Sequence, residues 1–169
     1  FTGVPTGVAN LDSMTSGFQN SDSIILGARP SIGKTAMALS MMQHISLDRK
    51  IPCGFFSLEM STELIGMRIL AQESRVSMSK IRSGMIKIDE IQKIQDAAGR
   101  WFEAPLYIVD TPNMRLLELR SMARRMVEKH GVKIIFIDYI GLIATDIPTA
   151  PVFEQVSEIS KSLKALARE

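Results

Sequence analysis

The chain has 169 residues, 46% of them hydrophobic, which is enough for one domain with a buried core. Its 20 basic and 18 acidic side chains leave a net charge of +2, so overall charge does not indicate nucleic-acid binding and any such site must be local. The one cysteine, Cys53, excludes an internal disulfide or a cysteine-based metal cluster and fits a reducing, cytoplasmic compartment. The longest apolar run, 134–144, is interrupted by Asp138 and is too short to span a bilayer, so we expect no membrane partner.

Short apolar runs alternate with amphipathic stretches along the chain, which is the pattern of βαβ units around a parallel sheet. The predicted strands are 23–28, 54–58, 106–110 and 132–138. The predicted helices are 34–47, 62–74 with Ser61 as N-cap, 77–82, 89–102, 116–129 and 152–168. The predicted helix at 89–102 carries a core stripe of Ile91, Ile94, Ala98 and Trp101. The predicted fold class is α/β, a mainly parallel sheet flanked by helices.

The stretch "GARPSIGKT" at 27–35 joins the first predicted strand to the helix that follows it. A phosphate cradle needs inward backbone N–H groups, a flexible turn, a helix N-terminus and a cation. Gly33 permits the turn, Lys34 can reach the β- and γ-phosphates, and the Thr35 hydroxyl can ligate Mg²⁺. The predicted nucleotide-binding residues are Ala28, Arg29, Pro30, Ser31, Ile32, Gly33, Lys34, Thr35 and Ala36. Alanine at 28, where the usual pattern has glycine, is tolerable if that residue needs no positive φ; the alternative is a plain strand-to-helix turn.

Two acidic residues follow predicted strands. Asp138 ends "IIFID", the arrangement of a Walker B acid that holds Mg²⁺ directly or through water. Glu59 comes just after "FFSL" and is the candidate to orient or deprotonate a water for attack on the γ-phosphate. The alternative for each is a solvated carboxylate that caps a helix or pairs with a lysine. His44 and His130 have no neighbouring ligand pattern, which favours surface positions over catalysis.

Six segments, taken in order, resemble the replicative DnaB-type hexameric DNA helicases of bacteria and phages. They are "TGVPTGVANLDSMTSGF", "GARPSIGKTA", "FFSLEMS", "VDTPNMR", "FIDYIGLI" and "EQVSEISKSLKALARE". The resemblance implies a RecA-like P-loop NTPase core and an ATP-driven motor that moves 5′ to 3′ on single-stranded DNA and unwinds duplexes. It also implies ATP and Mg²⁺ as cofactors, a homo-hexamer, and a primase and a helicase loader as partners.

The resemblance assigns a role to each candidate site residue. Lys34 and Thr35 match the phosphate and magnesium residues, Asp138 matches the Walker B acid, and Glu59 matches the residue that activates water. The single domain 1–169 would be a truncated motor domain. It would lack the amino-terminal primase-interacting domain, the arginine finger, and a sheet strand between the predicted strands 23–28 and 132–138. On that expectation the sheet has a gap, and the chain alone is weakly active or inactive.

Two departures from the resemblance concern the far side of the predicted site. Gly141 stands where similar helicases usually have glutamine, and the loop "TDIPTAPVF" lacks the basic residues that would face DNA. A basic helix face formed by Arg120, Arg124 and Lys129 is the other candidate for DNA contact, although such a face is usually solvated. The DNA-binding residues therefore stay unassigned.

Three other functions share parts of this pattern. A RecA/RadA-type recombinase ATPase has the same fold and phosphate chemistry but forms open filaments instead of closed rings. A loading module would bind ATP without hydrolysis, which Glu59 disfavours, and a small-molecule kinase would need an acceptor pocket that the sequence does not indicate.

Overall fold

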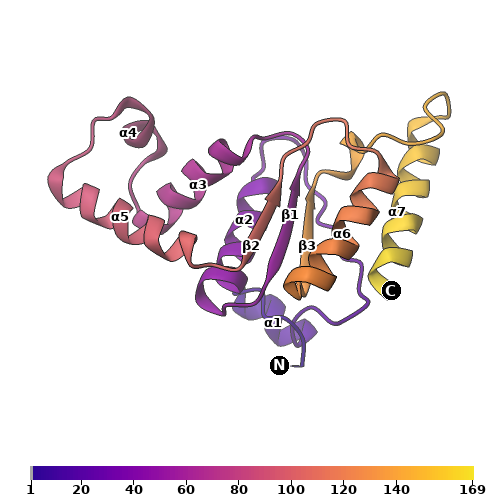
Figure 1. Ribbon diagram of the computed structural model, residues 1–169, viewed down its shortest axis with the longest axis horizontal. Coiled ribbons are helices and arrows are strands. Elements are labelled where there is room, and N and C mark those ends of the chain that lie inside the picture. The colour runs from indigo at the N-terminus through magenta and orange to yellow at the C-terminus, as the bar shows by residue number, and fades with distance from the viewer. Residues whose placement is uncertain (1) are drawn as a thin grey trace.

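The computed structural model describes residues 2–169 and confirms the α/β class, with a parallel sheet between helices (Figure 1). The elements in chain order are α1 (Ala9–Thr15), α2 (Lys34–Gln43), the π-helix η1 (His44–Asp48), β1 (Cys53–Ser57), α3 (Thr62–Ser74), α4 (Met78–Ser83), α5 (Ile88–Phe102), β2 (Leu106–Val109), α6 (Leu116–His130), β3 (Ile134–Asp138), the 3₁₀ turn η2 (Ile140–Leu142) and α7 (Val152–Arg168). Among the helices of residues 2–169, none is both long and apolar enough to cross a membrane.

The sheet has three parallel strands in the order β2-β1-β3. In the register of the central strand, Cys53 lies beside Leu106 on one side and Ile134 on the other. At the other end, Ser57 lies beside Asp138, so β1 and β3 finish at the same level. Because all three strands run the same way, their carboxyl ends form one edge, at the top of Figure 1, where β1 leads to α3.

Each face of the sheet is covered by helices, and β1 is buried along its whole length. Alternate side chains of a strand point to opposite faces, so Phe55 and Phe56 enter different cores. Phe55 packs in a cluster with residues of α2, η1 and α3, and Phe56 packs in a second cluster with residues of α6 and α7. This two-sided burial explains why β1 is a continuous apolar run instead of an alternating one.

The sequence predicted most helices to within a residue, and the exceptions have local causes. α3 and α7 match their predicted ranges, and Ser61 caps α3 as expected, since its hydroxyl accepts a hydrogen bond from the Leu64 N–H at 3.4 Å. The predicted helix 34–47 ends as α-helix at Gln43 and continues as the π-helix η1. The sequence did not predict the short α1 or η2.

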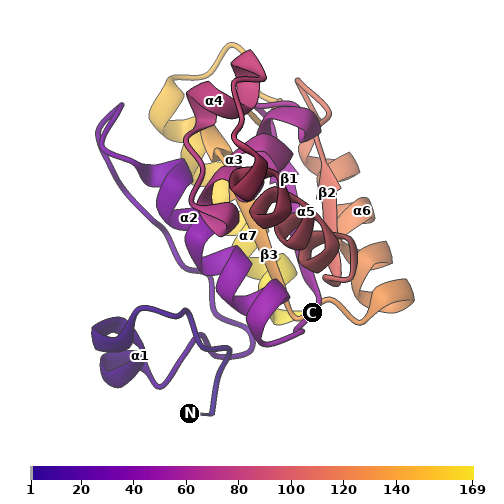
Figure 2. The same ribbon diagram turned by 90° about the vertical axis from the view of Figure 1, so that its left-hand side faces the viewer.

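The predicted strand at 23–28 is wrong for this structure. These residues have no regular secondary structure and pair with no strand in the described chain, and Ile24, Ile25 and Leu26 are exposed. An apolar run becomes a strand only where a neighbouring strand supplies hydrogen-bond partners, and none among residues 2–169 lies beside it. In Figure 2 this segment stands apart from the sheet on its way to α2. Within residues 2–169, no strand pairs with this segment or with the outer side of β3.

Helices α3, α4 and α5 form a lobe beside the sheet (Figure 1). α3 and α5 approach closely because Gly66 faces the indole of Trp101: a Cβ built on Gly66 would lie 2.3 Å from Cη2 of that ring. The predicted core stripe of α5 is partly wrong, because Ile91 is 43% exposed and the buried residue is Ala97. The sequence shows that α5 is amphipathic, but it does not show how much of the apolar face of α5 the partner helix α3 covers.

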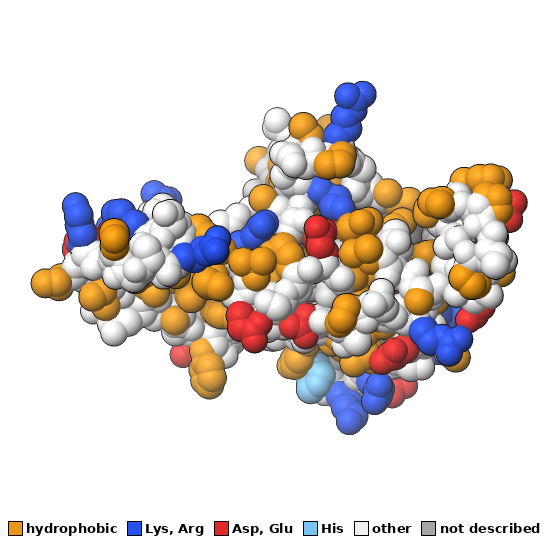
Figure 3. Space-filling view, turned by 90° about the horizontal axis from the view of Figure 1, so that it is seen from above, with side chains coloured by type: hydrophobic (Ala, Val, Ile, Leu, Met, Phe, Trp, Pro, Cys, Tyr) orange, Lys and Arg blue, Asp and Glu red, His pale blue; other side chains and the backbone are white. Residues whose placement is uncertain are grey.

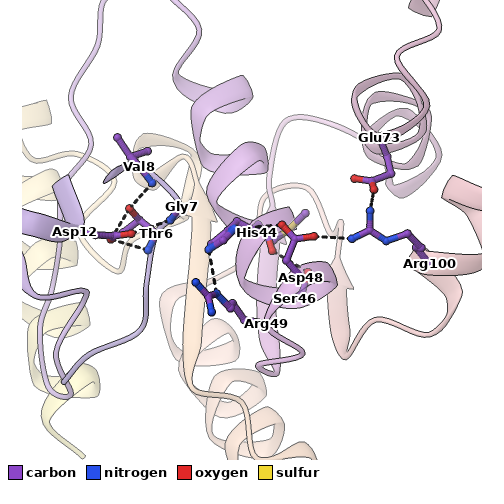
Figure 4. Close-up of polar contacts among 11 residues, drawn as sticks. Thr6, Gly7, Val8, Asp12, His44, Ser46, Asp48, Arg49, Glu73 and Arg100 are labelled. Carbon is purple, nitrogen blue, oxygen red and sulfur yellow. Dashed lines mark hydrogen bonds and ion pairs between the residues drawn. The ribbon is translucent and has the colours of Figure 1, made fainter. Parts of the chain in front are cut away.

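A buried carboxylate organises the amino-terminal segment (Figure 4). Asp12 Oδ1 accepts hydrogen bonds from the Thr6 N–H and the Thr6 hydroxyl, both at 2.8 Å, and Oδ2 accepts from the Gly7 N–H at 3.1 Å. Burial raises the pKa of Asp12, but these hydrogen bonds and the nearby His44 outweigh it, so the pKa lies below its ordinary value. Gly7 in turn packs on the His44 ring, where a Cβ would lie 2.6 Å from Cγ.

The Gly66 contact generates a matched stability prediction. Gly66→Ala should lower the free energy of unfolding by about 1–3 kcal/mol, because the new methyl group forces α3 away from Trp101. Gly99→Ala, in α5, is the control: its Cβ would enter open space, and replacing a mid-helix glycine should stabilise by about 0.5–1 kcal/mol. Denaturant unfolding measures both, and equal effects of the two variants would contradict the close helix packing.

The Asp12 network generates a pH-dependent prediction. Asp12→Asn should lower the free energy of unfolding at neutral pH by about 1–3 kcal/mol, because an amide cannot accept all three hydrogen bonds. The folded-state pKa of Asp12 is lowered, so its contribution is present above the unfolded-state pKa and disappears as the pH falls through the folded-state pKa. Thermal unfolding at a series of pH values should show the two proteins converging in acid. The exposed Asp22→Asn is the control and should match the wild type throughout.

Candidate nucleotide-binding site

The predicted cradle lies at the start of α2, on the carboxyl edge of the sheet. Residues 27–32 are exposed, and Figure 2 shows this segment as a loop that extends from the body before α2 begins. Gly33 precedes α2 with φ 107°, a left-handed conformation that favours glycine, and its carbonyl accepts the Met37 N–H at 2.9 Å. Apart from Gly33 and its chain neighbours, no described atom lies within 4 Å of a Cβ built on Gly33, so this side of the helix N-terminus is open. A helix N-terminus with free N–H groups facing open space is suited to an anion.

Alanine at position 28 is compatible with the loop. Ala28 does not have a positive φ, so the condition under which alanine can replace the usual glycine is met. Ser31 does have a positive φ, 65°, which is uncommon for a residue with a side chain. The turn therefore places its left-handed residues at Ser31 and Gly33, immediately before Lys34.

The structure brings together three of the predicted site residues, Lys34, Thr35 and Asp138, although Asp138 lies more than 100 positions further along the chain than the other two. The Thr35 hydroxyl donates a hydrogen bond to Asp138 Oδ2 at 2.6 Å, and Lys34 Nζ lies 3.3 Å from Asp138 Oδ1. The Asp138 side chain is only 7% exposed, whereas that of Lys34 is 29% exposed. A buried carboxylate requires such partners, because an isolated buried charge is strongly unfavourable.

Glu59 lies on the same edge but outside this cluster. The backbone N–H of Leu58 donates to the Asp138 carbonyl at 2.9 Å, which continues the β1–β3 pairing to the residue before Glu59. The chain then turns, because the buried Ser57 hydroxyl donates to the Met60 carbonyl at 2.6 Å and accepts the Met60 N–H at 3.2 Å. Glu59 is the exposed residue of this turn, and within residues 2–169 its carboxylate makes no hydrogen bond or ion pair. A carboxylate held at a fixed backbone position but free at its oxygens suits a group that acts on water.

Thr35 and Asp138 place a hydroxyl oxygen and a carboxylate oxygen side by side, and both are ligand types that Mg²⁺ takes. No group of three or more His, Cys, Asp or Glu side chains within residues 2–169 could hold a metal by itself. Magnesium is commonly held by one or two protein oxygens together with phosphate oxygens and water. The adjacent hydroxyl and carboxylate match that chemistry and do not match a zinc or calcium site.

The sequence-based prediction missed two residues of this edge, Tyr139 and Asp110. Lys34 Nζ lies 4.1 Å from the centroid of the Tyr139 ring. Asp110, just after β2, accepts the Thr62 N–H at 2.7 Å, and this hydrogen bond lowers the pKa of Asp110. The signal for Asp110 was its place at a strand end, like Asp138. The signal for Tyr139 was its position directly after the Walker B acid.

The basic face predicted on α6 is largely paired within the chain. Glu169 Oε1 accepts a hydrogen bond from Arg120 Nη2 at 2.9 Å, and its Oε2 accepts one from Arg124 Nε at 2.6 Å. These contacts, Arg124 first, lower the pKa of Glu169 to about 2. The contacts with Glu169 join α6 to the end of α7.

Other basic side chains gather over the α3–α5 lobe, among exposed hydrophobic side chains, at the left of the view from above in Figure 3.

Comparisons with known proteins identify the family of this chain. Residues 3–169 match the family described as DnaB-like helicase C terminal domain. The replicative DNA helicase DnaB of Treponema pallidum is 52% identical over 167 residues, and that of Geobacillus stearothermophilus is 44% identical over 169 residues. Each comparison covers 99% of this chain but only 38% and 37% of the respective relative, so the chain spans well under half the length of these proteins.

Two solved structures have the same fold. One is an ATPase domain, with a TM-score of 0.93 and 29% identity over 99% of this chain and 60% of that one. The other is a DnaB-like replicative helicase, described with its interactions with primase, again with a TM-score of 0.93 and 29% identity over 99% of this chain and 41% of that one. These likenesses confirm the RecA-like core. The chain therefore belongs to the DnaB-like helicase C-terminal domain family.

Proposed function

We propose that this chain is the ATPase motor of a replicative DNA helicase, which couples ATP hydrolysis to 5′-to-3′ movement on single-stranded DNA and to duplex unwinding. The observation that carries the proposal is the cluster of Lys34, Thr35 and Asp138 at the N-terminus of α2. Membership of the helicase family supports the assignment over a recombinase, a non-hydrolysing loading module or a small-molecule kinase.

In the proposed site the loop 28–36 surrounds the phosphates of ATP. The Lys34 ammonium meets the β- and γ-phosphates, because it is a partly exposed cation beside the helix N-terminus. The Thr35 hydroxyl and the Asp138 carboxylate hold Mg²⁺, which when bound neutralises charge on the phosphates. Glu59 orients a water and accepts its proton. We therefore propose Glu59 as a catalytic residue, together with Lys34, which contacts the reacting phosphates.

The wider assembly is also part of the proposal. A homo-hexamer, single-stranded DNA, a primase and a helicase loader are the proposed partners, in the cytoplasm. One of the two similar solved structures is a helicase described with its interactions with primase, which supports the primase partner here.

Electron microscopy of the intact protein should show closed rings on ATP and single-stranded DNA, whereas open helical filaments would favour the recombinase alternative.

Lys34→Ala should abolish most nucleotide binding, because a methyl group cannot replace the charge-assisted contact with the phosphates. Binding of a fluorescent ATP analogue to the intact protein, with Mg²⁺ present, measures the effect. Lys93→Ala, on the exposed face of α5, removes an equal charge far from the cradle and is the control. If the Lys34 variant bound the analogue as well as the control, the cradle would be assigned wrongly.

Glu59→Gln should separate binding from chemistry. The amide keeps the shape of the side chain but cannot accept a proton, so ATP should bind normally while turnover falls by about 10²-fold or more. Phosphate release in the presence of single-stranded DNA measures turnover. Glu63→Gln, also exposed and four residues further along, should retain wild-type turnover. Unchanged hydrolysis by the Glu59 variant would exclude its role as the base.

A further inference from the structure

The aromatic ring of Tyr139 forms one side of the environment of Lys34. The Lys34 ammonium lies 4.1 Å from the ring centroid and 3.3 Å from Asp138 Oδ1, so two consecutive residues of the chain contact the same cation. One contact is an ion pair and the other is a cation–π contact with the face of the ring. The hydroxyl of the tyrosine is not what meets the ammonium.

The backbone around Tyr139 fixes where its ring lies. Tyr139 follows the last residue of β3 and has extended backbone angles, φ −129° and ψ 160°. Its carbonyl accepts the Leu142 N–H at 3.1 Å, which closes the turn η2. The position of the ring is thus set by the end of the Walker B strand and not by the cradle loop.

Gly141 leaves room for this ring. A Cβ built on Gly141 would lie 3.0 Å from Cε2 and 3.3 Å from Cδ2 of Tyr139. Gly141 does not have a positive φ, so its backbone would accept alanine and the consequence of a side chain there is steric. Any side chain at 141 would press the ring away from its present position by a few tenths of an ångström or more.

We propose that Tyr139 is a positioning residue for Lys34 and that Gly141 permits this role. The ring and the Asp138 carboxylate confine the Lys34 ammonium to a position at the mouth of the cradle, from which it reaches the phosphates. This inference rests on the proposed function of Lys34 in nucleotide binding. It adds two residues of the "IDYIG" segment, Tyr139 and Gly141, to the site besides Asp138.

Confinement matters because a lysine side chain is flexible and loses conformational freedom when it binds an anion. If the ring face already holds the ammonium before nucleotide binds, less conformational freedom is lost on binding. The ring also attracts the ammonium less strongly than a second carboxylate would, so it competes less with the phosphates for this cation. Tyr139 is 37% exposed, so the contact belongs to the weaker, solvent-accessible class. Loss of the ring should therefore weaken nucleotide affinity by about two- to fivefold.

The test measures the dissociation constant of a fluorescent ATP analogue with Mg²⁺ on the intact protein, together with the thermal midpoint of each variant. Tyr139→Leu should bind about two- to fivefold more weakly, and Tyr139→Phe, which keeps the ring face, should restore the affinity. Tyr107→Leu is the matched control, since Tyr107 is the other tyrosine of the chain and stacks on His130 instead of on a lysine. Tyr107→Leu should change stability but not affinity.

A double-mutant cycle tests whether Gly141 acts through the Tyr139 ring. Gly141→Ala should weaken binding in the wild-type background, because the new methyl group presses on the ring, and should have no effect in the Tyr139→Leu background. Additive losses of the two substitutions would overturn the proposed route.

The outcomes separate this inference from the proposed function. If the wild type bound no nucleotide, the proposed function itself would fail. If the wild type bound nucleotide and Tyr139→Leu bound it equally well, only the role of Tyr139 would be rejected. The role would also be rejected if Tyr139→Phe were as weak as Tyr139→Leu, because the hydroxyl and not the ring face would then be responsible.

Discussion

The contact of the Asp138 carboxylate with Lys34 and Thr35 is the interaction on which the candidate site depends. It joins the first turn of α2 to the last residue of β3, two elements that come together only in the folded chain. Their relative position is set by β1, which pairs with β3 and buries Phe55 against α2. The two-sided burial of β1 thus holds the proposed phosphate-binding and metal-binding residues in register.

Two carboxylates on the same edge have different environments and hence different proposed tasks. Asp138 is buried and engaged by two partners, which suits a fixed ligand. Glu59 is exposed on a turn that the Ser57 hydroxyl holds in place, which suits a group that must meet water. Because the Leu58 N–H donates to the Asp138 carbonyl, the backbone next to Glu59 is held against the backbone of Asp138.

Contacts on the opposite end of α2 connect the site to the rest of the molecule (Figure 4). His44, at the start of η1, packs on Gly7, and its Nδ1 lies 3.1 Å from Asp48 Oδ2. Asp48 also pairs with Arg100 of α5. The far end of the helical segment that begins at the cradle therefore contacts both the amino-terminal segment and the α3–α5 lobe.

The sequence by itself determined the α/β class and the bounds of α3 and α7, because local periodicity and turn residues carry that information. It also predicted the cradle and both candidate acids, from a strand-to-helix turn and from acids that follow strands. Only the tertiary structure decided that 23–28 pairs with no described strand, that Gly66 of α3 faces Trp101 of the predicted α5 stripe, and that Tyr139 faces Lys34. The physical reason is the same in all three cases. Pairing, close approach and cation–π contact depend on a partner far away in the chain, and the residues on either side of a position do not specify that partner.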